Sequence, residues 1–222
     1  MRTASKIISW IFLPLFMPVY GLLLGMYFPS ESIASVQSEG SLFHMPPQFK
    51  YHILLLFVIL SVIAPGFSLL MLKRQKRINS VEMDDKEERS FPISLTVIYC
   101  GMLGIFILMQ VPKHAVPLVI FSLPWAGVLA SSLAGLINRY EKISLHAMGA
   151  GMLFGFLVVY FSTQSYFDYH LVILSALLGG VIMSARMFLG KHSLRECVSG
   201  YVLGFLAVFL VLTFFPNFPP YL

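Results

Sequence analysis

Residues 185–196, which read ARMFLGKHSLRE, place five ionisable side chains between two long apolar runs. Arg186 is followed after five residues by His192, and His192 after three more by Glu196. Because residues four apart share one face of a helix, the Glu196 carboxylate can hold one imidazole nitrogen as an N–H and leave the lone pair of the other available. This is the arrangement of a histidine nucleophile, and the Arg186 guanidinium offers a forked donor that suits phosphate oxygens.

A purely structural explanation of the same stretch is a helix cap. Ser193 and Glu196 have the spacing of a capping box, in which the two side chains satisfy the first N–H groups of a helix. Arg186 and Lys191 would then only reach toward lipid headgroups. The two interpretations are compatible, because a glutamate near the start of a helix can serve the histidine instead of the backbone.

The stretch resembles the third motif of the type 2 phosphatidic acid phosphatase superfamily, whose members are membrane lipid phosphatases. That motif is Ser-Arg, five residues, His, three residues and Asp, and this chain is similar to it with Ala185 for Ser and Glu196 for Asp. The second motif of the family is Pro-Ser-Gly-His. The sequence ISLH at residues 143–146 is similar to it and keeps Ser144 and His146.

The first motif of that family, which is Lys, six residues and Arg-Pro, has a looser counterpart. The sequence KEERSFP at residues 86–92 contains Lys86 and Arg89, but the spacing is shorter and Glu82 stands where the family lysine would be. The resemblance therefore covers a phosphatase-like core at residues 86–204, about half of the chain.

The resemblance implies an enzyme that removes phosphate from a lipid phosphate or lipid diphosphate through a phosphohistidine. His192 would attack phosphorus, and Glu196 would orient it and stabilise its imidazolium form. His146 would protonate the leaving oxygen and then activate water. The phosphoryl oxygens would be held by Arg186, Arg89, Lys86 and Ser144. Neither a metal ion nor another cofactor is expected, because arginine and lysine meet the phosphate charge.

The composition places these residues in a membrane protein. Of the 222 residues, 58% are hydrophobic and only 11% are charged, whereas about 25% are charged in a typical soluble domain. A hydrocarbon core about 30 Å thick needs roughly 20 apolar residues per helix. We therefore expect an all-α polytopic bundle of six to seven spans that forms a single integral membrane domain over residues 1–222, with a polar loop at 74–91. The seven expected spans are residues 7–28, 51–72, 92–112, 115–138, 144–163, 170–190 and 193–215.

The first apolar run begins with basic residues, as a secretory signal does. It extends to Phe28 without a small-residue cleavage site, so we expect it to form the first span. Cys100 and Cys197 are isolated within apolar runs, which indicates neither a disulfide framework nor a metal site.

With seven spans, the N-terminus and the loops after spans two, four and six share one side of the membrane. This side carries 13 of the 15 Lys and Arg residues, and the other side carries only Lys50 and Lys113. Because cationic short loops stay in the cytoplasm, we expect the N-terminus and the active site on the cytoplasmic side of the cell membrane. The formal charge of +5 then reflects membrane orientation, and no nucleic-acid partner is expected.

Two small-xxx-small patterns occur, one in the fifth expected span and one in the seventh. Such patterns let two helices approach closely. If the two faces pack against each other, His146 and His192 meet at the same membrane surface. The glycines concerned are Gly151, Gly155, Gly200 and Gly204.

The sequence is also compatible with two other functions. An acid-rich loop with Asp84, Asp85, Glu87 and Glu88 could hold magnesium and diphosphate in a membrane prenyltransferase, but such sites generally need a second acid-rich loop. The degenerate first motif also fits a non-enzymatic protein, such as a scaffold, a small transporter or an inactive phosphatase relative. The sequence leaves the oligomeric state open, and the lipid as well, among phosphatidate, phosphatidylglycerophosphate, a polyprenyl diphosphate and a phosphorylated lipid A.

Overall fold

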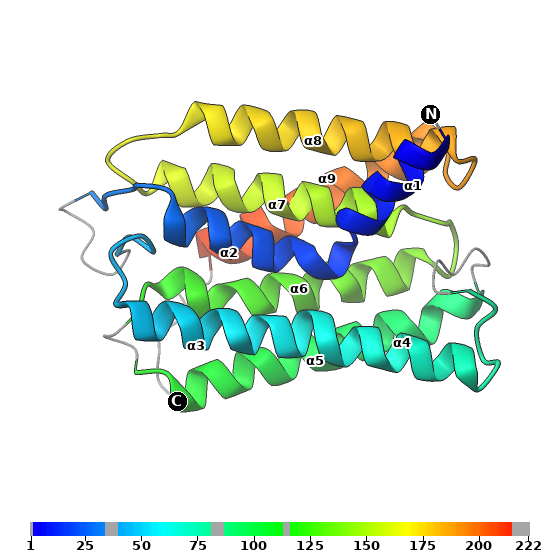
Figure 1. Cartoon of the computed structure of the whole chain (residues 1–222), viewed down its shortest axis with the longest axis horizontal. Coiled ribbons are helices and arrows are strands. Elements are labelled where there is room, and N and C mark those ends of the chain that lie inside the picture. Colours follow the sequence, from blue (N-terminus) through cyan, green and yellow to red (C-terminus); the bar gives the residue numbers. More distant parts are fainter. Residues whose placement is uncertain (1, 34–39, 81–86, 113–115, 215–222) are drawn as a thin grey trace.

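In the computed structural model the chain is a bundle of α-helices, described for residues 2–33, 40–80, 87–112 and 116–214 (Figure 1). Within these residues, seven helical stretches are long and apolar enough to cross a membrane. They are Arg2–Tyr27, Pro47–Arg74, Glu87–Gln110, Leu118–Ile137, Leu145–Ser162, Tyr169–Phe188 and Leu194–Phe214. The expected all-α polytopic fold is confirmed, and the count is seven.

The segments that carry the candidate site residues lie at one end of the bundle. Figure 1 shows the start of α1 (Arg2–Ile11) at the same end as three connections between helices. These connections join α4 (Ala64–Arg74) to α5 (Ser90–Gln110), α6 (Leu118–Ile137) to α7 (Leu145–Ser162), and α8 (Tyr169–Phe188) to α9 (Leu194–Phe214). The shared face that follows from counting spans is therefore present in the fold.

The first span is interrupted near Pro14, whereas the sequence predicted one continuous helix. After α1 ends, the 3-10 turn η1 covers Pro14–Phe16 and α2 covers Met17–Tyr27. Leu13 is extended, with φ −60° and ψ 143°, because a proline ring disfavours helical backbone at the residue before it. The interruption divides the first span into two short helices.

The second span is also irregular, and again a proline explains it. It consists of α3 (Pro47–Phe57), the π-helical turn η2 (Val58–Ile63) and α4. Pro65 has no N–H and its ring excludes regular packing against the preceding turn. The chain inserts one extra residue, so that the Ala64 N–H donates to the Ile59 carbonyl five residues earlier.

Helix α7 lies at the centre of the bundle and packs against α2, α8 and α9 (Figure 1). A Cβ added to Gly151 or Gly155 would crowd the backbone of α9, and a Cβ added to Gly200 or Gly204 would crowd the backbone at and near the start of α7. The glycine patterns of the fifth and seventh spans thus pack against each other, which is the condition stated for the two histidines to meet. This packing brings the first turns of α7 and α9 together.

Candidate active site

Four of the candidate side chains line one cavity near the end of the bundle that carries the motifs. The cavity has a volume of about 330 Å³, and its wall includes Arg89, His146, Arg186 and His192. These residues lie in the turn η3 (Glu87–Arg89), the first turn of α7, the last turn of α8 and the connection from α8 to α9. Residues up to about 100 positions apart in the sequence thus meet at one site.

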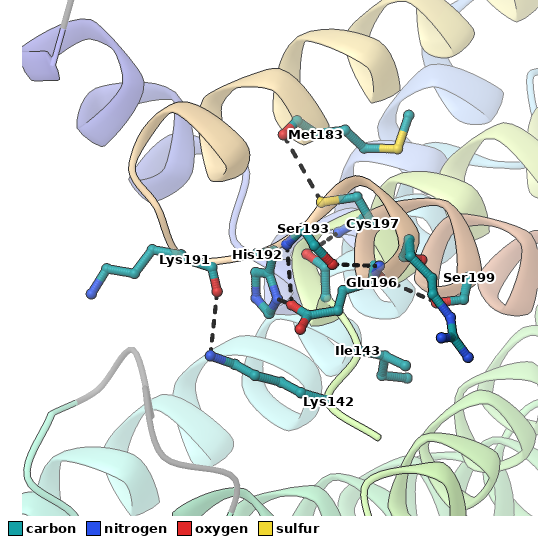
Figure 2. Close-up of polar contacts among 12 residues, drawn as sticks. Lys142, Ile143, Met183, Lys191, His192, Ser193, Glu196, Cys197 and Ser199 are labelled. Atoms are coloured by element: carbon teal, nitrogen blue, oxygen red, sulfur yellow. Dashed lines mark hydrogen bonds and ion pairs between the residues drawn. The ribbon is translucent and has the colours of Figure 1, made fainter. Parts of the chain in front are cut away.

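His192 and Glu196 form the pair that their spacing predicted, as Figure 2 shows. The Nδ1 atom of His192 lies 2.7 Å from Oε2 of Glu196, and the imidazole is buried while the carboxylate is partly exposed. A carboxylate oxygen accepts, so Nδ1 carries the hydrogen atom and Nε2 of the neutral ring keeps its lone pair. The lone pair that a histidine nucleophile would need is therefore on Nε2.

The same glutamate completes a capping box at the start of α9. The Ser193 N–H donates to Oε2 of Glu196 at 3.3 Å, and the Glu196 N–H donates to the Ser193 hydroxyl at 3.3 Å. The His192–Glu196 contact and the capping box coexist, because Oε2 of Glu196 accepts from the imidazole and from the Ser193 N–H. Arg186 is buried and does not reach toward the headgroups. The helix start thereby fixes the orientation of His192.

The surroundings of His192 keep it neutral. Burial lowers the pKa of His192 to about 4; the hydrogen bond to Glu196 acts in the opposite direction, and the positive charges of Arg89, Arg186 and Lys142 lower the pKa further. The imidazole is therefore unprotonated at neutral pH, and this is the form that has a lone pair for attack.

The two arginines bring buried positive charge to the cavity. Arg89 is 3% exposed and Arg186 is 2% exposed. Arg89 donates from Nη1 to the Ile143 carbonyl at 2.9 Å, which joins η3 to the segment before α7. Two buried guanidinium groups on the wall of one cavity favour an anion there, and their donor geometry suits phosphate.

Ser144 occupies the N-cap of α7. Its buried hydroxyl accepts from the Ala147 N–H at 3.3 Å, and its own N–H donates to the Glu196 carbonyl at 3.0 Å. Ser144 is not among the residues that line the cavity. The structure thus places it as a helix cap that also joins the starts of α7 and α9.

His146 has a partner that the sequence did not reveal. The Nε2 atom of His146 lies 3.2 Å from the backbone carbonyl oxygen of Ser9 in α1, and both residues line the cavity. The pairing joins residues 137 positions apart, which no local spacing can show. The available signal was Pro14, because a proline ends the helical hydrogen-bond pattern and leaves carbonyls before it free for other donors.

Of two lysines at this end of the bundle, the structure describes Lys142 but not Lys86. Lys142 donates from Nζ to the Lys191 carbonyl at 3.3 Å, next to His192 in sequence (Figure 2). Its charge helps to lower the pKa of His192, although Lys142 is not among the residues that line the cavity. Lys86 lies outside the described residues, which resume at Glu87.

Apolar residues form most of the remaining cavity wall. The cavity extends along the two interrupted spans, along α5 and along the inner faces of α6 and α7. Its wall includes Leu13, Phe16, Leu60, Leu69, Ile93 and Met152. Gly66 of α4 also lines the cavity, and a Cβ added there would meet no atom within 4 Å. A wall of this kind suits a hydrocarbon chain.

The part of the chain that the structure describes contains no group of three or more His, Cys, Asp or Glu side chains that could hold a metal ion. Among the acids of the polar loop, Glu88 accepts from the backbone and side-chain N–H groups of Asn79 at 3.0 and 2.6 Å. Asp84 and Asp85 lie outside the described residues. The Glu88 carboxylate is thus hydrogen-bonded to Asn79 within the polar loop.

Comparison of the chain with models of known protein families, with curated proteins and with solved structures finds no match. The resemblance to the phosphatase superfamily therefore depends on the motif residues alone.

Proposed function

We propose that this chain is an integral membrane phosphatase that releases phosphate from a lipid phosphate or lipid diphosphate. The observation that carries the proposal is the composition of one cavity wall: two histidines, two buried arginines and an otherwise largely apolar lining within the spans. The arginines suit the phosphate, and the apolar wall suits the hydrocarbon part of the same molecule.

The proposed reaction has two steps. Nε2 of His192 attacks phosphorus and forms an N–P bond, while the bond from phosphorus to the leaving oxygen breaks and that oxygen takes the Nδ1 proton of His146, which enters this step in its imidazolium form. Water then attacks the phosphohistidine and gives its proton to His146, which releases phosphate and frees His192. Glu196 stabilises the positive charge that develops on the His192 ring.

Arg89 and Arg186 would hold the phosphoryl oxygens and meet the charge that develops on them. The start of α7 contributes backbone N–H groups and the favourable end of its dipole. In this proposal Ser144 caps the start of α7 and does not itself contact phosphate. Lys86 is still proposed to contact phosphate.

Phosphate release by the purified protein from a panel of lipid phosphates and diphosphates tests the proposal. His192→Ala should abolish release, because no other side chain can replace the nucleophile. His170→Ala is the matched control, since His170 is exposed and lies in the first turn of α8, at the other end of the bundle. Wild-type rates in His192→Ala would exclude the histidine mechanism.

Dependence on a divalent metal separates this proposal from a prenyltransferase. Full activity in excess chelator is expected, because arginines meet the phosphate charge. Loss of activity in chelator with recovery on adding magnesium would instead favour the acid-rich loop as a metal site.

We further propose that the site faces the cytoplasm, because 13 of the 15 Lys and Arg residues lie on its side of the seven spans. Single cysteines at Ser80, Tyr140 and Arg195, in a protein with Cys100 and Cys197 replaced, should resist an impermeant thiol reagent in intact cells and react after lysis. A cysteine at Tyr166, at the opposite end, should react from outside. The reverse pattern would overturn the orientation.

A further inference from the structure

The interruption of the first span frees backbone carbonyls near the cavity. The Phe12 N–H still donates to the Ile8 carbonyl, but Leu13 is extended and Pro14 has no N–H. The Ser9 carbonyl instead accepts from Nε2 of His146 at 3.2 Å. The Ile11 carbonyl likewise accepts a side-chain donor, the Tyr20 hydroxyl, at 2.8 Å.

The partner atom fixes the tautomer of His146. A carbonyl oxygen can only accept, so the hydrogen bond requires the hydrogen atom on Nε2. The hydrogen atom on Nε2 stays hydrogen-bonded to the Ser9 carbonyl whether the ring is neutral or charged. The proton that His146 exchanges with substrate or water must therefore move at Nδ1.

Among the helical serines that the structure describes, Ser9 has the fully buried hydroxyl without a hydrogen-bond partner. Four others, Ser61, Ser94, Ser122 and Ser199, donate to the carbonyl four residues earlier, as serine hydroxyls in helices commonly do. The Ser9 hydroxyl makes no hydrogen bond within the described part of the chain, although Ser9 is only 6% exposed and lines the cavity. Buried hydroxyls are nearly always satisfied, so the Ser9 hydroxyl is available to a molecule that enters the cavity.

We propose that Ser9 belongs to the phosphate site: its carbonyl positions His146 with the hydrogen atom on Nε2, and its hydroxyl donates to an oxygen of the bound phosphate group. This inference depends on the proposed function and adds the first span to the site. The ligand class is a tetrahedral oxyanion, because Arg89, Arg186 and both histidines line the same cavity.

Binding of orthovanadate, which imitates the phosphoryl group, tests the hydroxyl. Ser9→Ala should weaken vanadate binding and lower kcat/KM by about tenfold or more, as expected for a lost hydrogen bond to a charged group. Ser5→Ala is the matched control, because Ser5 is a buried serine one turn earlier in α1 that does not line the cavity. It should bind vanadate as the wild type does.

The results separate this inference from the proposed function. Vanadate binding that is lost in His192→Ala but unchanged in Ser9→Ala would overturn the role of the Ser9 hydroxyl and leave the phosphatase standing. A wild-type protein that neither binds vanadate nor releases phosphate would overturn both.

The positioning role has a test that needs no activity. Nitrogen-15 NMR of histidine-labelled protein, with the His146 signals assigned by their loss in His146→Gln, should show the hydrogen atom on Nε2 in the neutral ring. A ring with its hydrogen atom on Nδ1 would overturn the contact with the Ser9 carbonyl.

Discussion

The two sides of the cavity are built differently. On one side, α7 and α9 pack so closely that a Cβ on Gly151 or Gly204 would overlap a backbone carbonyl of the facing helix. On the other side, the interrupted first and second spans leave open space, and a Cβ on Gly66 would meet nothing. The tight pair carries His146 at the start of one helix and the His192–Glu196 pair at the start of the other.

This difference suits the separate needs of chemistry and of substrate binding. Groups that react must be held within a fraction of an ångström, and closely packed backbones supply that rigidity. A hydrocarbon chain needs apolar space and little directional contact. The two interrupted spans border this space, and Leu13, Pro14 and Pro65 line it.

The largest effect is expected from Gly204→Ala, which breaks the tight side. The new Cβ would overlap the Met148 carbonyl oxygen, and backbone cannot move aside as a side chain can. We expect a loss of about 3 kcal/mol in the free energy of unfolding, measured by thermal unfolding in detergent. Gly101→Ala is the control, since a Cβ there meets open space and alanine favours a helix over glycine by about 0.5–1 kcal/mol. Equal melting temperatures for the two variants would contradict the close contact.

Glu196→Gln should act on the chemistry of the tight side without unfolding it. The amide keeps the shape of the side chain but loses the charge that stabilises the His192 imidazolium, so kcat should fall by about 100-fold with little change in KM. Glu141→Gln is the matched control, because Glu141 forms an exposed ion pair with Arg195 at 2.6 Å at the same end of the bundle. Steady-state kinetics of both variants measure this effect. An equal decrease in kcat in both variants would show that Glu196 has no special role.

Gly66→Phe tests whether the open side of the cavity holds the hydrocarbon chain. A phenyl group there would occupy space in the cavity wall that the structure leaves empty. We expect kcat/KM for a long-chain lipid phosphate to fall by about tenfold relative to that for a short-chain phosphate ester, as loss of a few buried CH₂ groups would produce. Gly101→Phe, which does not line the cavity, should leave this ratio unchanged. An unchanged ratio in Gly66→Phe would place the hydrocarbon chain elsewhere.

The tight side could be foreseen from sequence better than the open side. The seven spans follow from apolar runs of about 20 residues, and the contact between His192 and Glu196 follows from helical spacing. The glycine patterns indicated that α7 and α9 could approach closely, and the structure shows that they do so against each other. The cavity could not be predicted, since it arises where several non-adjacent spans fail to fill the space between them.

The site residues show the same limit. We expected Ser144 to hold a phosphoryl oxygen, but a serine before a helix can also cap it, and the structure shows its hydroxyl accepting from the Ala147 N–H. Ser9 was missed because its partner lies 137 positions away. Proline positions indicate where helices are interrupted, but not which side chain takes the freed carbonyl.

The smallest effect concerns the pH dependence of stability on the tight side. Burial lowers the pKa of His192 to about 4 in the folded protein, whereas an unfolded histidine has a pKa of about 6.5. Between these values the unfolded chain binds more protons, so the free energy of unfolding falls as the pH is lowered from about 6.5 toward 4. Wild-type protein should therefore lose about 1–2 kcal/mol more than His192→Gln between pH 7 and pH 5, measured by unfolding in detergent at both values. Equal losses of unfolding free energy in the two proteins would show that burial does not hold His192 neutral. The close packing at the start of α9 would then not explain the neutral form that the proposed attack requires.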